Sequence, residues 1–345
     1  MEFRRILVRA TNWVGDAVMS LPALHALRAA HPRAHIAILA RPWVAGLYGR
    51  EPFCDEVIPY EAGKGWRELG TKAGIAVSLR DRQFDCALLL QNAFEAAALA
   101  WMARIPVRIG YDRDARGRLL TNPVPVPKPG EIPVHQRFYY LELLKRGGLI
   151  PAYSLESEIR LTGGGSAAQN GRALLSGAGL SPPFLGVSPG AAFGGAKRWL
   201  PERFADSAVK LARQRGSSVV IFGSKEEAVI GEQVAREIEQ AGVAVHNLAG
   251  KTSLREFIDM AAACELFLTN DSGSMHIASA LGIPTVVVFG PTDETATGPA
   301  GRRNAVLREP VECSPCHRRE CPIDHRCMTR VTADRAVGAG LELLK

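Results

Sequence analysis

Short apolar, β-branched runs alternate with segments of helical periodicity along the chain. In the first half, the runs at 5–10, 35–40, 84–90 and 107–110 are nearly continuous, and residues 17–30 between the first two have helical spacing. A strand that is apolar at every position is buried on both faces, as in a parallel sheet covered by helices on both sides. The sequence therefore predicts an α/β fold of the doubly wound type.

The second half repeats this alternation. We expect strands at 184–189, 218–223, 245–248, 265–270 and 285–290. We expect helices at 167–177, 201–215, 226–241, 253–262, 274–281 and 331–344. A second doubly wound domain follows from this order of elements.

A chain of 345 residues is long enough for two domains. We place an N-terminal Rossmann-like domain at 1–165, a C-terminal one at 166–330, and a closing helix at 331–345 that could pack back on the first domain. Five prolines between Thr121 and Pro133 exclude regular structure there. No apolar run has the length of a membrane-spanning helix, and the N-terminus lacks a signal-peptide pattern, so we expect a cytoplasmic protein.

The net charge of +7 lies entirely in the first half of the chain. Residues 1–150 carry an excess of Lys and Arg, whereas residues 151–345 are balanced. This asymmetry indicates an anionic partner, such as a nucleic acid, a phosphorylated substrate or an acidic membrane surface. Nucleic acid is disfavoured because no recognised binding motif is present and aromatic residues do not interleave with the basic ones.

Four cysteines lie close together near the C-terminus, with two histidines among them. They are Cys313, Cys316, Cys321 and Cys327, with His317 and His325. Such soft ligands could hold a structural zinc ion, but their spacing matches no common zinc module. A locally packed group of thiols is the alternative.

The segment 270–276, Asn-Asp-Ser-Gly-Ser-Met-His, lies where a predicted strand ends and a predicted helix begins. Asp271, Ser272 and Ser274 are residue types that favour a helix start, and Gly273 allows a ligand to approach the backbone. The first N–H groups of the helix and the positive end of its dipole suit a phosphate. An ordinary capped helix would have the same pattern.

A glycine-rich loop at 190–201 follows another predicted strand and carries Lys197. It is not a P-loop, because Ala196 separates Gly195 from Lys197 and no Ser or Thr follows the lysine. Nucleotide hydrolysis is therefore not indicated. A lysine on such a loop can still neutralise a departing diphosphate, although a solvated surface loop is the alternative.

Asp16 follows Gly15 at the junction of the first strand and the first helix, at the carboxyl edge of the predicted sheet. A carboxylate there could accept a proton from an attacking hydroxyl, or it could simply cap the helix. The one Asp-x-Asp sequence, Asp112-Arg113-Asp114, is surrounded by arginines that oppose a metal cation. We interpret it as an anion-facing loop in which the aspartates form local pairs.

Taken together in their order along the chain, these three motifs resemble those of the ADP-heptose:lipopolysaccharide heptosyltransferases of glycosyltransferase family 9. The similarity is carried by TNWVGDAVMSLPAL (11–24), PGAAFGGAKRWLPERFA (189–205) and NDSGSMHIASALGIPTVVVFGPTD (270–293). Trp13 and the cysteine-rich tail are more similar to the second heptosyltransferase than to the first. The resemblance implies the GT-B architecture, with two Rossmann-like domains that face a central cleft and bind acceptor (N-terminal) and nucleotide sugar (C-terminal).

The resemblance also implies roles for residues at matching positions. Asp16 corresponds to the proposed general base. The implied donor and ADP contacts are Lys197, Glu226, Asp271, Ser272, Gly273, Ser274, Met275 and His276; Glu227 is nearly as good as Glu226 for the ribose. The candidate acceptor contacts are Asn12, Trp13, Lys64, Arg67, Arg113, Arg116, Arg118 and Arg137.

The implied reaction is an inverting transfer of heptose from ADP-L-glycero-β-D-manno-heptose to heptosyl-Kdo2-lipid A, the inner core of lipopolysaccharide. No cofactor or metal is required by this scheme, and the basic first half could hold the enzyme weakly at the inner face of the cytoplasmic membrane. The alternatives are heptosyltransferase I, another GT-B transferase with a different acceptor, and a sugar-nucleotide epimerase.

Overall fold

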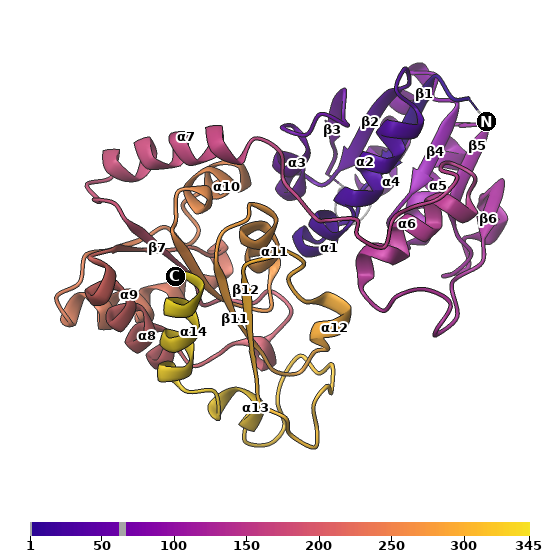
Figure 1. Cartoon of the computed structure of the whole chain (residues 1–345). Helices are drawn as coiled ribbons and strands as arrows, with labels where there is room; N and C mark the ends of the chain where they lie inside the picture. Colours follow the sequence, from indigo (N-terminus) through magenta and orange to yellow (C-terminus); the bar gives the residue numbers. More distant parts are fainter. Residues whose placement is uncertain (1, 62–66) are drawn as a thin grey trace. The chain divides into compact units, whose positions relative to one another are not determined.

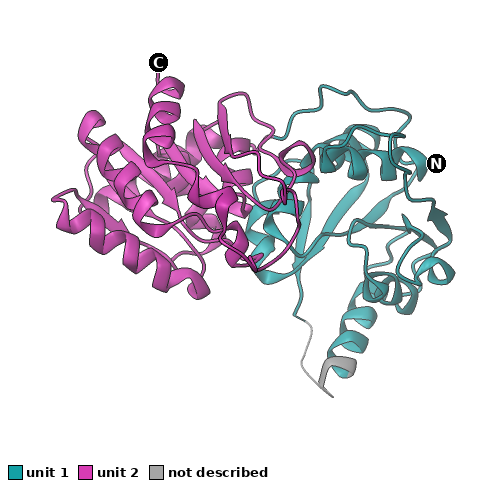
Figure 2. Ribbon diagram, turned by 90° about the horizontal axis from the view of Figure 1, so that it is seen from below, with its two compact units in different colours: residues 1–159 teal, residues 160–345 magenta. Residues whose placement is uncertain are grey.

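The computed structural model describes residues 2–61 and 67–345. The chain divides into two compact units, residues 1–159 (unit 1) and 160–345 (unit 2), which Figure 2 shows in different colours. From the sequence we place the border between the domains at 165/166, whereas the two compact units meet at 159/160. Each unit contains one six-stranded parallel sheet with helices between successive strands, so the doubly wound α/β fold is confirmed.

Unit 1 has the strand order β3-β2-β1-β4-β5-β6, with every neighbouring pair parallel. Its strands are β1 (Arg5–Arg9), β2 (His35–Ala40), β3 (Glu56–Pro59), β4 (Cys86–Leu89), β5 (Val107–Tyr111) and β6 (Asn122–Val124). Its helices are α1 (Val14–Met19), α2 (Leu21–Ala30), α3 (Pro42–Tyr48), α4 (Arg67–Asp81), α5 (Phe94–Met102), the short 3-10 helix η1 (Gly117–Leu119) and α6 (Gln136–Arg146). The central strands are almost entirely buried, as their continuous apolar sequences predict.

Unit 2 has the order β12-β11-β10-β7-β8-β9, again entirely parallel. Figure 1 labels β7, β11 and β12 of this sheet. Its strands are β7 (Phe184–Ser188), β8 (Ser218–Ile221), β9 (Val245–Asn247), β10 (Leu266–Asn270), β11 (Thr285–Phe289) and β12 (Asn304–Arg308). Its helices are α7 (Gly164–Gly177), η2 (Gly195–Lys197), α8 (Pro201–Arg215), η3 (Lys225–Glu227), α9 (Ala228–Gln240), α10 (Leu254–Ala262), α11 (Gly273–Ala280), α12 (Glu294–Thr297), α13 (Arg326–Thr329) and α14 (Ala333–Leu343). All five strands expected in this half are present, and the half-buried edge strand β12 was not expected.

The helix expected over 17–30 is two helices, α1 and α2, which meet at Ser20. Pro22, at the start of α2, has no backbone N–H and its ring clashes with the preceding turn, so a single helix cannot continue through this point. As a result, α1 is a short helix that begins directly after the loop at the end of β1.

The proline-rich stretch 121–133 was expected to contain no regular structure, and this prediction is wrong at one point. β6 forms a three-residue strand in which Pro123 pairs in register with Gly110 of β5. β6 lies at the edge of the sheet, where a proline does not break a ladder because its missing N–H would face away from the neighbouring strand.

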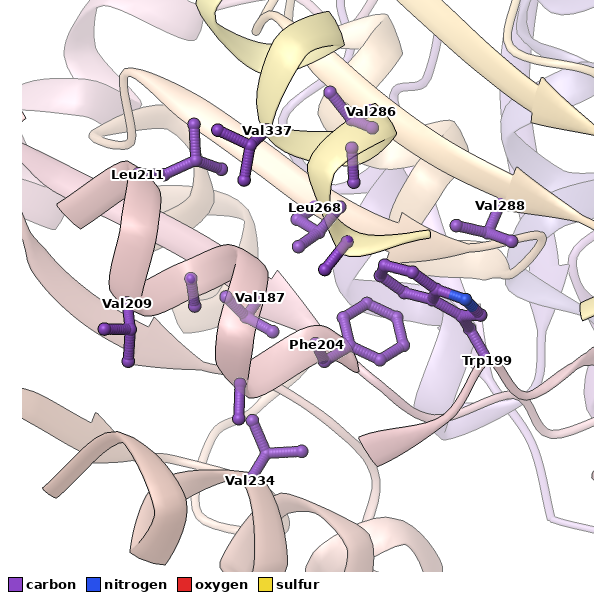
Figure 3. Close-up of a cluster of buried hydrophobic side chains, with 14 of the residues drawn as sticks. Val187, Trp199, Phe204, Val209, Leu211, Val234, Leu268, Val286, Val288 and Val337 are labelled. Carbon is purple, nitrogen blue, oxygen red and sulfur yellow. The ribbon is translucent and has the colours of Figure 1, made fainter. Parts of the chain in front are cut away.

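The core of unit 2 joins the sheet to helices α8, α9 and α14. Figure 3 shows part of this cluster, with the rings of Trp199 and Phe204 next to each other, Val288 beside Trp199 and Val187 beside Phe204. The two rings meet edge to face with their centroids 5.0 Å apart. The Trp199 indole N–H donates to the carbonyl of Val331 at 3.1 Å, so this buried ring has its polar atom satisfied.

The closing segment 331–345 is part of unit 2. Helix α14 packs against α8, β11 and β12, and Gly340 lies against Leu266 and Leu211. Within the described residues, no helix is both long enough and apolar enough to cross a membrane.

Candidate functional site

The candidate site in unit 2 is built where β7 and β10 end, because these neighbouring parallel strands bring their following loops to the same edge of the sheet. Asn270, the last residue of β10, is completely buried between these loops. Its amide N–H₂ donates to the carbonyls of Pro189 at 2.8 Å and Gly190 at 3.3 Å, and its carbonyl accepts the backbone N–H of Trp199 at 2.9 Å. Asn270 therefore holds both ends of the glycine-rich loop, at Pro189–Gly190 and at Trp199, against the carboxyl end of β10.

Helix α11 begins at Gly273, three residues after this asparagine. Ser272 is its N-cap residue in extended conformation, but its side chain does not cap the first-turn N–H groups. The Ser272 hydroxyl instead lies 3.3 Å from that of Thr269, and the Ser188 hydroxyl donates to Ser274 at 3.0 Å. Because the helix start carries partial positive charge and has no side-chain cap, it suits an anionic group.

Lys197 and Asp271 form a buried ion pair at this helix start. The lysine Nζ lies 2.5 Å from Oδ2 of Asp271, and the two side chains are 13% and 5% exposed. Thr292, after β11, donates its hydroxyl to the same carboxylate oxygen at 2.6 Å. The ammonium also lies 4.8 Å from the centroid of the Phe193 ring, a cation–π distance. These contacts hold one positive charge at a fixed place beside α11.

The other predicted donor residues differ in what they can offer. Met275 is fully buried and packs with Val287 and Phe289, so only its backbone can face a ligand. His276 is 6% exposed and its backbone N–H donates to Ser272 at 3.4 Å.

Glu226 and Glu227 have different environments on η3. Glu227 accepts the Ser224 backbone N–H at 2.8 Å in a capping box, and its side chain lies against Gly190. Glu226 is exposed, and hydrogen bonds from its own backbone N–H and the Ser224 hydroxyl lower the pKa of its carboxyl. The carboxylate of Glu226 is thus the one that reaches solvent.

In unit 1, Asp16 lies in the first turn of α1, after β1. It is not the N-cap, which is Trp13, so simple capping does not account for it. The hydroxyl of Tyr140, on α6, donates to Oδ1 of Asp16 at 3.1 Å. Burial and the negative charge of Asp16 raise the pKa of Tyr140 well above its usual value, which keeps this hydroxyl protonated as a donor.

A buried arginine supports the loop before Asp16. Arg9 is 1% exposed, and its Nη2 donates to the Asn12 side chain at 2.9 Å and to the Tyr60 hydroxyl at 2.8 Å. The Trp43 indole N–H donates to the Asn12 carbonyl at 2.9 Å. Asn12 is therefore fixed from both sides, while Trp13 next to it is 57% exposed.

Comparison with known proteins identifies the family. The sequence model of glycosyltransferase family 9 (heptosyltransferase) matches residues 73–326. The chain belongs to glycosyltransferase family 9. The lipopolysaccharide heptosyltransferases 2 of Salmonella typhimurium and Escherichia coli K12 are each 32% identical to it over 309 residues, 88% of either chain. The solved structure of the E. coli ADP-heptose LPS heptosyltransferase II matches with a TM-score of 0.83 and 29% identity, covering 99% of this chain and 98% of that one, which confirms the GT-B architecture.

The predicted acceptor arginines of this family 9 glycosyltransferase are not equivalent. Arg116 is completely buried, and its guanidinium donates to the carbonyls of Tyr111 and Gln91 and to the side chain of Asn92. It holds the loop together and is not available to a ligand, so we correct the prediction for this residue. A charged surface loop was expected here, but a fully packed arginine at its centre was not.

The remaining basic candidates differ in exposure. Arg113 and Arg118 are exposed, and Arg113 pairs with Asp114 at 3.2 Å, as expected for this loop. Arg137 is half-buried, with its guanidinium 4.7 Å from the Phe138 ring. Lys64 lies outside the described residues, as does the side chain of Arg67 at the start of α4.

The four C-terminal cysteines are all unpaired thiols. Burial, together with the nearby thiols of Cys313, Cys321 and Cys316, raises the pKa of Cys327 to about 11. Among the described residues, no group of three or more His, Cys, Asp or Glu side chains is arranged to hold a metal ion.

Sequence reasoning missed Arg9 and Tyr140, which support Asp16 and its loop in unit 1, and Thr292, which bonds to Asp271 in unit 2. Arg9 could have been noticed as a cation inside an apolar run, and Thr292 as a hydroxyl just after a predicted strand. Tyr140 gave no such signal, because 124 residues separate it from Asp16.

Proposed function

We propose that this family 9 enzyme transfers heptose from ADP-L-glycero-β-D-manno-heptose to heptosyl-Kdo2-lipid A, with inversion at the anomeric carbon. The Salmonella typhimurium and E. coli relatives are named lipopolysaccharide heptosyltransferase 2, and the solved relative is an ADP-heptose enzyme. The coverage of 88% or more of both chains supports extending this activity to the whole protein.

The observation that carries the donor side of this proposal is the Lys197–Asp271 pair beside the uncapped start of α11. A nucleoside diphosphate brings two or more negative charges, which the ammonium and the first-turn N–H groups of Ser272 to Met275 can meet together. Asp271 then positions Lys197 through its ion pair instead of contacting the diphosphate itself. Glu226, whose carboxylate reaches solvent, is the proposed ribose contact in preference to Glu227.

On the acceptor side, we propose Asp16 as the general base. Its carboxylate takes the proton of a heptose hydroxyl as that oxygen forms a bond to the anomeric carbon of the donor. The bond from this carbon to the β-phosphate oxygen breaks on the opposite face, so ADP departs and the configuration inverts. Tyr140 orients the carboxylate through the 3.1 Å hydrogen bond to Oδ1.

The negative charge that develops on the leaving diphosphate is met by Lys197 and by the N-terminus of α11. Fixed donors of this kind need no reorganisation during the reaction. The scheme therefore assigns the positive charge to the protein and requires no cofactor or metal ion.

Acceptor recognition is assigned to unit 1. Asn12 and Trp13 adjoin Asp16, and the exposed Arg113 and Arg118, with Arg137, offer cations for the carboxylates and phosphates of an inner core. The excess positive charge of residues 1–150 also suits weak binding at the anionic inner face of the cytoplasmic membrane.

The test is turnover of ADP-heptose with Kdo2-lipid A acceptors that carry either no heptose or one. Product formed only from the acceptor with one heptose supports the proposal. Product formed only from the acceptor with none would assign a heptosyltransferase I activity instead. Release of an epimerised ADP-sugar without any acceptor would assign an epimerase.

A further inference from the structure

The cysteine-rich segment (residues 313–328) packs against the loop that carries Lys197. The backbone N–H of Ala196 donates to the carbonyl of Arg319 at 2.9 Å. One residue earlier, the N–H of Gly195 donates to Oε1 of Glu320, also at 2.9 Å. Two consecutive amides of the glycine-rich loop are thus bound by this segment, 125 residues away in sequence.

The glycines of the loop allow this close approach, and at Gly194 the neighbouring atoms are backbone. Gly194 has a φ of 153°, and a Cβ there would lie 2.3 Å from the Arg319 carbonyl oxygen. A Cβ on Gly195 would lie 2.5 Å from a carboxylate oxygen of Glu320. These two glycines, which resemble part of a phosphate-binding loop in the sequence, therefore accommodate another part of the same chain.

His325 completes the contact. Its Nε2 lies 2.8 Å from the carbonyl oxygen of Ala196, and because a carbonyl only accepts hydrogen bonds, the ring nitrogen must donate. Both backbone polar groups of Ala196, the residue directly before Lys197, are consequently held by the cysteine-rich segment.

The same segment also supports the partner of Lys197. The backbone N–H groups of Cys316 and His317 donate to the carbonyl of Pro291 at 3.0 and 2.8 Å. The next residue is Thr292, whose hydroxyl donates to Asp271. The segment therefore contacts both chain stretches that hold the Lys197–Asp271 pair.

We propose that Glu320 and His325 are positioning residues for the donor diphosphate, because they fix the backbone of Gly195 and Ala196 and so hold the ammonium of Lys197 beside the start of α11. A loop with glycines at 190, 194 and 195 loses much conformational freedom when it becomes ordered. Hydrogen bonds that already order the loop in the free enzyme reduce the conformational entropy lost on binding, and this increases affinity for the diphosphate. This inference rests on the proposed role of Lys197 in donor binding.

The test is calorimetric binding of ADP to the full-length protein. We expect Glu320→Ala and His325→Ala each to raise the Kd for ADP about fivefold to tenfold, the effect of losing one hydrogen bond of about 1–1.4 kcal/mol. Glu320→Gln and His325→Gln should stay within about twofold, because the glutamine amide offers an acceptor in the first case and a donor in the second. Alanine variants that bind ADP normally would overturn the proposal, as would glutamine variants as weak as the alanine ones.

Asp324→Ala is the matched control, because its carboxylate lies in the same segment but bonds to Arg326. It should leave the Kd for ADP unchanged. Glu320 is exposed, so its truncation should also leave the thermal unfolding temperature unchanged. If His325→Ala unfolds at a lower temperature, the comparison of Glu320→Ala with Glu320→Gln decides whether the segment positions Lys197.

A double-mutant cycle separates positioning from a general structural effect. In a Lys197→Ala background, Glu320→Ala should add less than a twofold change in Kd, since its effect acts through the lysine. An equal loss in both backgrounds would overturn the inference. If Lys197→Ala alone leaves ADP binding unchanged, the proposed donor site itself is wrong. If only Lys197→Ala weakens binding, the donor site stands and the positioning role of Glu320 and His325 is refuted.

Discussion

The ammonium of Lys197 lies 2.5 Å from the carboxylate of Asp271, and both side chains are largely buried. A buried ion pair is costly to desolvate, and its net contribution to stability is small. Its value here lies in placing a positive charge beside the start of a helix before the substrate arrives. The pair connects β7 and β10 through loops that only the folded sheet brings together.

Removing Lys197 should affect both stability and activity. Lys197→Ala leaves the Asp271 carboxylate buried without its cation, so we expect the free energy of unfolding of unit 2 to fall by about 3 kcal/mol. The kcat should fall by about 10²–10³-fold, because stabilisation of the leaving diphosphate is lost. Chemical denaturation and steady-state kinetics measure the two effects.

The double variant Lys197→Ala/Asp271→Asn provides the control. It removes the unpaired charge, so it should recover most of the lost stability while activity stays low. Recovery of activity together with stability would show that Lys197 acts only in folding.

Asp16→Asn should lower kcat by about 10²–10⁴-fold, the usual cost of losing a general base. The Kd for ADP should not change, because ADP lacks the acceptor hydroxyl whose proton Asp16 is proposed to take. Tyr140→Phe removes the hydroxyl that donates to Asp16, and we expect it to lower kcat by about tenfold or less. A near-normal kcat for Asp16→Asn would rule out the assignment.

Substitution of Arg116 should lower stability, whereas substitution of Arg118 should weaken acceptor binding. Arg116→Ala leaves the carbonyls of Tyr111 and Gln91 without a buried donor, so we expect a loss of about 2–3 kcal/mol in the free energy of unfolding. Arg118→Ala, at an exposed position, should change stability by less than about 0.5 kcal/mol and raise the acceptor KM several-fold. Equal stability of the two variants would contradict the burial of Arg116.

Two glycines of helix α7 should respond in opposite directions to alanine. A Cβ at Gly171 would lie 1.9 Å from the Asp259 carbonyl oxygen of α10, so Gly171→Ala must push the two helices apart, at a cost of about 1–3 kcal/mol. At Gly165 a Cβ meets no atom of the described residues within 4 Å, so Gly165→Ala should stabilise the helix by about 0.5–1 kcal/mol. Thermal unfolding of the two variants, measured side by side, checks the sign of each effect.

Much of the fold could be predicted because the burial pattern of a strand or helix is visible in a short stretch of sequence. A buried strand of a parallel sheet is apolar at every position, so β1, β2, β4, β7, β10 and β11 were all predicted from short windows of sequence. Parallel strands also end at the same edge, so Asp16, Lys197 and Asp271, which all follow strands, could be proposed as functional residues. The edge strands β3, β6 and β12 were missed because they are only partly buried and have mixed composition.

The sequence alone therefore determined the α/β class, the order of most strands and the candidate residues of the site. Only the tertiary structure decided their partners: Tyr140 on Asp16, Thr292 on Asp271, and Glu320 and His325 on the backbone before Lys197. It also showed that Arg116 is a buried support and not a surface cation. The physical reason is how far apart the contacting residues lie along the chain. Periodicity reflects burial within one element, whereas each of these contacts joins residues that only the packing of distant segments brings together.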